Sequence, residues 1–145
     1  MLEHPKRVGD RSTLAVMLAL ASTGLDISVP FGENCRYDLV IDDGDRLLRV
    51  QCKTGRLRNG GVNFATCSTY AHHRSSLQAR RDYQGQIDAF AVYCPETLAV
   101  YFVPLADVPV RNVAQLRTAP PKNGQSRRIR YAADYEIARV SSEPR

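Results

Sequence analysis

The sequence predicts an α/β fold in which helices pack on a mixed β-sheet. Three features of the chain lead to this prediction: a helical pattern at 10–23, an alternating hairpin pattern at 36–53, and two strongly apolar runs at 87–94 and 98–103. Apolar runs of this length are typical of central strands. A helix followed by several strands is the order expected when helices cover a sheet.

The 145 residues, 43% of them hydrophobic, are enough for one domain with an ordinary core. We therefore expect a single domain over residues 1–145, with about residues 1–8 and 141–145 flexible. No apolar run approaches the ~18 residues of a membrane span. The start of the chain is polar and charged, so a secretory signal is not expected and the protein is predicted to be cytoplasmic.

Residues 10–23 have the spacing of an amphipathic helix. Asp10 or Ser12 is the expected N-cap, because each can accept from a backbone N–H left unpaired in the first turn. Gly24 is the expected stop, since glycine takes a positive φ without a Cβ clash. The residues predicted to face the core are Leu14, Met17, Leu18 and Ala21.

The hairpin at 36–53 turns at Asp43 and Gly44, a pair that favours a tight turn. One face of its return strand carries Leu48, Val50 and Cys52, and the other carries Leu47, Arg49, Gln51 and Lys53. The other expected elements are a strand at 26–30, a strand near 62–68, a basic loop with a short helical piece at 70–84, a short strand at 115–118 and a last helix at 129–137.

The four cysteines, at positions 35, 52, 67 and 94, are widely spaced. No Cys-x-x-Cys pair exists, which excludes a zinc ribbon on spacing. In a reducing compartment we expect four free thiols. Cys52 and Cys94 lie in apolar strand patterns and are expected in the core.

The formal net charge of +5 favours a polyanionic partner such as DNA. Basic residues form three groups that flank the hairpin strand, and three groups together favour phosphate contacts over a merely solvated surface. Ser68, at a strand end near the hairpin, is a further candidate for contact with the DNA backbone. The basic groups are Arg56 and Arg58; Arg74, Arg80 and Arg81; and Lys122, Arg127, Arg128 and Arg130.

Antiparallel pairing puts Asp38 roughly opposite Gln51, and Lys53 lies two residues further on the same face. An acid, an amide and an amine on one buried face cost free energy unless they pair or bind something. The Asp38 carboxylate, the Gln51 amide oxygen and the Cys52 carbonyl are hard ligands of the kind that Mg²⁺ prefers. Lys53 can orient water or stabilise phosphorane charge. The same spacing also fits an ordinary surface pair worth only ~0.2–1 kcal/mol.

The segment Arg-Tyr-Asp-Leu-Val-Ile-Asp, which contains Asp38, and the segment Val-Gln-Cys-Lys-Thr-Gly at 50–55 resemble the core of the PD-(D/E)XK nuclease superfamily. The second half reads Gln-x-Lys in place of Asp/Glu-x-Lys, a variant similar to the group I intron-associated homing endonucleases. The resemblance covers nearly the whole chain. It includes residues 9–12, 30–34, 87–97, 101–104 and 122–135, the last of which contains Gln125.

The resemblance implies a restriction-endonuclease-like central mixed β-sheet flanked by α-helices. It also implies DNA cleavage that depends on Mg²⁺, with Mn²⁺ as a substitute, by a homo-oligomer such as a dimer or tetramer. Asp38, Gln51 and Lys53 are then the catalytic residues, with Asp38, Gln51 and Cys52 on the metal. Gln125 would support the DNA or the site.

One position departs from the superfamily pattern. The first helix of these nucleases carries a Glu that helps to hold the metal, and by spacing that position is Thr13 here. A neutral hydroxyl is a poorer Mg²⁺ ligand than a carboxylate. Two alternatives therefore stay open beside a homing-type nuclease: a Holliday junction resolvase, and a DNA-binding protein with a degenerate nuclease fold.

Overall fold

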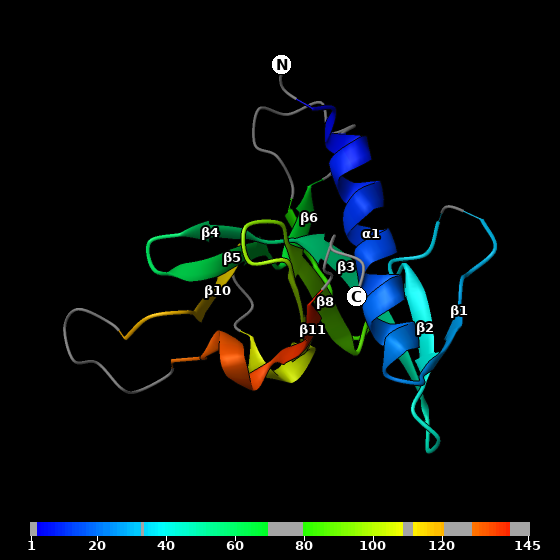
Figure 1. Ribbon diagram of the computed structural model, residues 1–145. Coiled ribbons are helices and arrows are strands. Elements are labelled where there is room, and N and C mark those ends of the chain that lie inside the picture. Colours follow the sequence, from blue (N-terminus) through cyan, green and yellow to red (C-terminus); the bar gives the residue numbers. More distant parts are fainter. Residues whose placement is uncertain (1–2, 33, 70–79, 109–111, 121–128, 140–145) are drawn as a thin grey trace.

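A computed structural model describes residues 3–32, 34–69, 80–108, 112–120 and 129–139. Its centre is a six-stranded mixed sheet with the strand order β1-β2-β3-β8-β9-β11 (Figure 1). The strands of this sheet are β1 (Asp26–Ser28), β2 (Leu39–Asp42), β3 (Leu47–Thr54), β8 (Ala89–Cys94), β9 (Ala99–Pro104) and β11 (Glu136–Arg139). The single parallel pair, β3 with β8, makes the sheet mixed, because the other neighbours in it run antiparallel.

Two smaller sheets complete the strands. A three-stranded sheet has the order β10-β5-β4, and β6 pairs with β7. Their bounds are β4 (Arg56–Arg58), β5 (Gly61–Ala65), β6 (Cys67–Thr69), β7 (Arg80–Asp82) and β10 (Val113–Arg117). The helical elements are α1 (Pro5–Ser22) and two 3₁₀ turns, η1 (Leu105–Asp107) and η2 (Ala132–Asp134). No helix in the described parts of the chain is long and apolar enough to cross a membrane.

Helix α1 begins earlier than the sequence pattern predicts. Pro5 occupies the first turn, where its missing N–H is no loss, and the His4 imidazole accepts from Lys6 N at 3.2 Å. Neither Asp10 nor Ser12 is the cap, so that prediction is wrong. The predicted stop is confirmed, because Gly24 follows the helix with a φ of 85°.

The buried face of α1 starts two positions before the predicted one, at Ser12 instead of Leu14. Leu14 and Leu18 are 65% and 57% exposed, so placing them in the core was wrong. The buried set has the same helical spacing but smaller side chains, which let the helix axis approach the sheet closely. Its members are Ser12, Ala15, Val16, Ala19 and Leu20.

The central sheet separates two apolar cores. On one face, α1 packs against alternate residues of β2 and β3, including Leu39 and Val50. On the other face, the three-stranded sheet packs its own apolar side against β8 and β9, with Phe64 tilted against Phe90 at 5.6 Å. The alternation predicted for the return strand is confirmed, since its burial pattern along β3 alternates from Leu47 to Cys52.

The C-terminal part of the prediction was wrong. The helix expected at 129–137 is instead the 3₁₀ turn η2 followed by β11, which pairs with β9. The fold therefore has one α-helix on the sheet within the described residues, not helices on both faces. The strand expected at 115–118 exists as β10. Of the segment 70–84, residues 70–79 lie outside the described part, and the remainder contributes β7. All four cysteines are free thiols, with Cys52 and Cys94 buried as predicted.

Candidate active site

Asp38 lies immediately before β2 and is fixed by two contacts with the neighbouring strand. Its backbone N–H donates to Val50 O at 2.8 Å, and its Oδ2 accepts from Cys52 N at 2.8 Å. The β2–β3 ladder begins with the pair Leu39–Val50, and Asp38 precedes it. The two contacts hold Asp38 against the strand that carries Gln51 and Lys53, and the positive charge of Lys53 acts on its carboxyl.

The Asp38 carboxyl is half-buried, and burial raises its pKa above the ordinary value. The hydrogen bond from the Cys52 amide and the positive charge of Lys53 both act in the opposite direction, but burial outweighs them. An ionised Asp38 is thus short of positive charge around it. Burial removes the stabilisation that water gives to the negative charge, and a cation bound beside this carboxylate would replace it.

Cys52 contributes its main chain to the site. The N–H and C=O of one strand residue point to the same edge, so the Cys52 carbonyl points toward β2, as its N–H does. The β2–β3 ladder ends at the pair Leu39–Val50, so the Cys52 carbonyl lies beyond its end. It accepts a long contact of 3.5 Å from Gln51 Nε2. A strand amide and a strand carbonyl therefore both face the Asp38 side.

The Cys52 thiol points to the other face, against α1. Burial, and then the nearby charge of Asp38, raise its pKa to about 12. The thiol therefore stays protonated at neutral pH, and a protonated thiol is neither a nucleophile nor a metal ligand. This leaves the backbone carbonyl as the group by which Cys52 can hold a metal.

Lys53 is held by an aromatic residue that the sequence did not single out. Its Nζ donates to Tyr83 Oη at 3.0 Å and lies 4.9 Å from the centre of the ring. Arg36 covers the same ring, with Cζ 4.0 Å from the centroid. Arg36 lies two residues before Asp38, in the bend that leads into β2. Tyr83 had no local signal, because it reaches Lys53 from a distant segment.

Thr13, the position at which the sequence analysis expects an acid, lies on α1 and contacts β3. Its hydroxyl is in hydrogen-bond contact with the Cys52 thiol and also donates to Gly9 O at 3.1 Å. One residue earlier, the buried Ser12 hydroxyl lies 2.5 Å from Thr54 Oγ1. Two adjacent helix residues thus anchor α1 to the C-terminal half of β3, the half that carries Gln51 and Lys53.

The residues expected to contact DNA fall into three classes. Arg56 and Arg58 lie on β4, where Arg56 forms a 3.8 Å ion pair with Glu96 and Arg58 is exposed. Ser68, Arg80 and Arg81 are placed by their backbones on the β6–β7 pair, where Ser68 pairs with Arg81. The others, Arg74, Lys122, Gln125, Arg127 and Arg128, lie outside the described residues.

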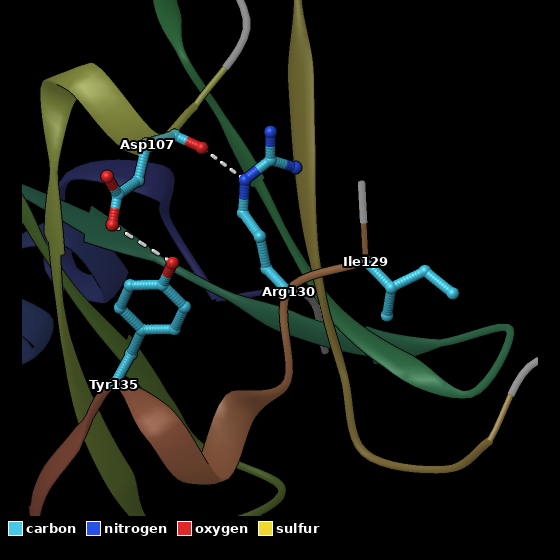
Figure 2. A pocket seen from close by; sticks show the side chains of 4 residues that line it. All are labelled: Asp107, Ile129, Arg130 and Tyr135. Carbon is cyan, nitrogen blue, oxygen red and sulfur yellow. Dashed lines mark hydrogen bonds between the residues drawn. The ribbon is translucent and has the colours of Figure 1, made fainter. Parts of the chain in front are cut away.

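A shallow pocket elsewhere on the molecule has different chemistry. It is lined by Asp107, Ile129, Arg130 and Tyr135 (Figure 2). Tyr135 Oη donates to Asp107 Oδ2 at 3.0 Å, and Arg130 Nε donates to the Asp107 carbonyl. Its one carboxylate is thus already engaged. Among the described residues, no three His, Cys, Asp or Glu side chains gather at one place.

Comparison with known proteins agrees with the fold. No curated protein sequence matches the chain. Among solved structures, the bacterial homing endonuclease I-Ssp6803I superposes with a TM-score of 0.73 over 92% of this chain and 89% of its own, at 24% identity. The sequence model of the PD-(D/E)XK endonucleases matches residues 3–138. This match includes α1, the β2–β3 hairpin and β11, and the chain therefore belongs to the PD-(D/E)XK endonuclease family.

Proposed function

We propose that the protein is a Mg²⁺-dependent DNA endonuclease of the homing type, with its active site at Asp38, Gln51, Cys52 and Lys53. The observation that carries the proposal is the hydrogen bond from Cys52 N to Asp38 Oδ2. It holds the carboxylate against the strand that presents an amide, a carbonyl and an ammonium group to the same region. Membership of an endonuclease family gives this cluster its chemistry.

The donor set suits a hard divalent cation. Asp38 Oδ2 is used by the Cys52 amide, which leaves Oδ1 for a metal. Gln51 now turns its Nε2 toward the Cys52 carbonyl, and a half-turn of the amide would present Oε1 instead. These oxygens are the ligands that Mg²⁺ and Mn²⁺ accept, while the protonated Cys52 thiol is not. A bound cation would polarise the phosphate and lower the pKa of a water molecule.

Lys53 supplies the positive charge that does not depend on a metal. Its ammonium group can donate to a phosphate oxygen or to the attacking water, and so stabilise the charge that develops in the transition state. The excess of basic residues, which gives a net charge of +5, supports binding to the DNA backbone. Arg56 and Arg58 on β4, with Ser68, Gln125 and the other predicted basic contacts, are our candidates for that role.

The test is cleavage of plasmid and linear DNA in Mg²⁺ or Mn²⁺ by wild type, Lys53→Met and Lys6→Met. Lys6 is the matched control because it is exposed on α1, away from β3. We expect cleavage by wild type and Lys6→Met, and a loss of roughly 10²- to 10³-fold in Lys53→Met. Equal rates in Lys53→Met and wild type, or no cleavage by wild type under any condition, would reject the proposal.

A second candidate function is DNA binding without turnover. It is favoured by one observation: Asp38 is the carboxylate at the site, and Thr13 offers a hydroxyl where the superfamily has Glu. This alternative predicts salt-sensitive DNA binding together with wild-type inertness in the cleavage test. The junction resolvase alternative is tested in the same assay, where it predicts faster cutting of a four-way junction than of a linear duplex of matched sequence.

Two active sites are the simplest way to cut both strands of a duplex, and closed symmetry supplies them. We therefore propose a homo-oligomer, a dimer or tetramer. Two large apolar residues on the outer face of α1, Leu14 and Leu18, are exposed and are available to a second copy of the chain. Light scattering of wild type and of Leu18→Lys tests this proposal. The molar mass in solution should be lower for the variant than for wild type, and a monomeric wild type would refute the assembly.

A further inference from the structure

We propose that Tyr83 is a positioning residue for Lys53, holding the ammonium group toward Asp38 and Gln51 through its hydroxyl. The inference rests on the proposed function. Its basis is the contact of 3.0 Å between Lys53 Nζ and Tyr83 Oη, made by a tyrosine that is only 3% exposed. A buried phenol that accepts from a lysine fixes the position of the lysine's charge.

The reason to fix this lysine lies in its side chain. A lysine side chain is flexible along its four-carbon stem, so a free ammonium group samples many positions. An acceptor with a fixed position removes most of that freedom before substrate arrives. One of the three N–H donors of Lys53 is used on Tyr83, and two remain for water and phosphate.

Tyr83 can act as a fixed acceptor because its own ring is held on several sides. Phe90 meets the ring edge-on, with the centroids 5.5 Å apart, and Phe90 is itself packed against Phe64. Arg36 stacks on the ring at 4.0 Å. At the backbone, Tyr83 O accepts from Gln86 N at 3.0 Å in the turn that leads to β8. The hydroxyl therefore has little room to move away from Lys53.

The arrangement also brings two cations to one ring. Arg36 and Lys53 both lie within cation–π distance of Tyr83, from segments on either side of Asp38 in the hairpin. The electron-rich ring face lessens the repulsion between these cations. Tyr83 thereby keeps Lys53 near Asp38, where the lysine charge already favours the ionised carboxylate.

The test removes the hydroxyl and keeps the ring, in Tyr83→Phe. The matched control is Tyr101→Phe, which also deletes a buried hydroxyl, here one that lies 3.0 Å from Thr97 Oγ1. Strand β8 separates Tyr101 from Lys53. The chain has three lysines, so the ¹⁵N ammonium spectrum of the metal-free and DNA-free protein is simple, and Lys53→Arg assigns the Lys53 signal.

Two measurements are made on each variant. We expect the exchange of the Lys53 ammonium protons with water to become severalfold faster in Tyr83→Phe and to stay unchanged in Tyr101→Phe. We expect kcat for DNA cleavage to fall about ten- to hundredfold in Tyr83→Phe with KM unchanged, because a misplaced catalytic group affects the transition state more than substrate binding.

An unchanged exchange rate of the Lys53 ammonium protons in Tyr83→Phe overturns the inference. If wild type cleaves DNA, an unchanged kcat in Tyr83→Phe overturns it as well. A fall in kcat equal to that of Tyr101→Phe has the same meaning, because it would reflect a general loss of packing. If wild type does not cleave DNA at all, the proposed function fails by itself. The ammonium exchange then decides whether Tyr83 holds Lys53, since that measurement needs neither metal nor substrate.

Discussion

Cys52 N donates a 2.8 Å hydrogen bond to Asp38 Oδ2, so the carboxylate of the candidate site is held by the main chain of β3. The same strand carries Gln51 and Lys53, and the charge of Lys53 acts on Asp38. The hydrogen bonds between the strands therefore fix the relative positions of the carboxylate, the amide and the ammonium group when the protein folds. Such fixed geometry is what a site needs in order to stabilise charge that appears only in the transition state.

Asp38→Asn should stabilise the metal-free protein at neutral pH while abolishing cleavage. Burial raises the folded-state pKa of Asp38. The stability that this group contributes is therefore present below its unfolded pKa and is lost as pH rises through the folded pKa. Asn removes that loss and can still accept from the Cys52 amide. Thermal melts should show a higher Tm for the variant at pH 7 and no difference well below the ordinary carboxyl pKa of about 3.9.

The exposed Asp26 provides the control, since Asp26→Asn should leave Tm unchanged at both pH values. Mg²⁺ should raise the Tm of wild type and not that of Asp38→Asn. Because binding requires an ionised carboxylate, the Mg²⁺ effect on wild type should fade as pH drops through the raised pKa of Asp38, earlier than for an ordinary carboxylate. A lower Tm for Asp38→Asn at pH 7 would contradict this account.

Thr13→Glu should strengthen metal binding and raise the cleavage rate. Thr13 contacts the Cys52 thiol on the helix side of β3, and a carboxylate there adds negative charge beside a site that has one acid of its own. We expect Mg²⁺ affinity to rise roughly tenfold, the scale on which groups next to a metal site act. Isothermal titration with Mg²⁺ measures the affinity, and plasmid cleavage measures the rate.

Two variants separate charge at this position from charge in general. Thr13→Gln has the size of Glu without its charge, and Leu14→Glu puts the same charge on an exposed neighbouring residue. Both should bind Mg²⁺ as wild type does. Equal affinities in all four proteins would mean that the missing acid is not what limits the site.

Much of the site was predictable because it depends on short-range pattern. The alternation along β3 fixes which of its residues share a face, so the sequence alone puts Gln51 and Lys53 together. The hairpin turn at Asp43 and Gly44 brings Asp38 to the same strand. The choice of Thr13 also used only local spacing, and its role stays a prediction.

The parts that were missed depend on distant contacts. Tyr83 lies 30 residues from Lys53 in sequence, and no local period relates the two. The buried face of α1 was misassigned because two stripes of the helix have the same spacing, and only packing on the sheet selects the one with Ala15 and Ala19. The C-terminal segment 129–137 forms the turn η2 and then enters β11 because the edge of β9 is available to it, which the sequence does not reveal.

Losing both hydroxyls of the Ser12–Thr54 contact should destabilise the protein by less than the sum of the two single losses. Ser12 is 2% exposed, and its hydroxyl lies 2.5 Å from Thr54 Oγ1. Ser12→Ala leaves the Thr54 hydroxyl in a part-buried place without this partner, which costs about 1–3 kcal/mol. Adding Thr54→Val removes the stranded hydroxyl, so the double variant should be less destabilised than the sum of the singles. Urea unfolding of all four proteins measures the coupling, and strict additivity would show that the two hydroxyls do not interact.

Substitution by alanine should change the stability of the protein in opposite directions at Gly55, which follows β3, and at Gly9, which lies in α1. At Gly55, two residues after Lys53, an added Cβ would lie 2.6 Å from Val62 Cγ1 and 2.8 Å from Val92 Cγ1, both buried side chains. Gly55→Ala should therefore destabilise the protein by about 1–3 kcal/mol through overpacking. Gly9 has open space and lies inside α1, so Gly9→Ala should stabilise the protein by about 0.5–1 kcal/mol.

Gly55→Ala should also slow cleavage, whereas Gly9→Ala should not. Gly55 N donates to Tyr93 O at 2.8 Å, which continues the parallel ladder of β3 and β8 beyond Lys53. Pushing Gly55 away from Val92 shifts the end of β3, and Lys53 would move with it relative to Tyr83. Thermal melts and plasmid cleavage of both variants test the pair. A Gly55→Ala protein with wild-type Tm would mean that Val62 and Val92 can yield, and the site would then keep its geometry and its rate.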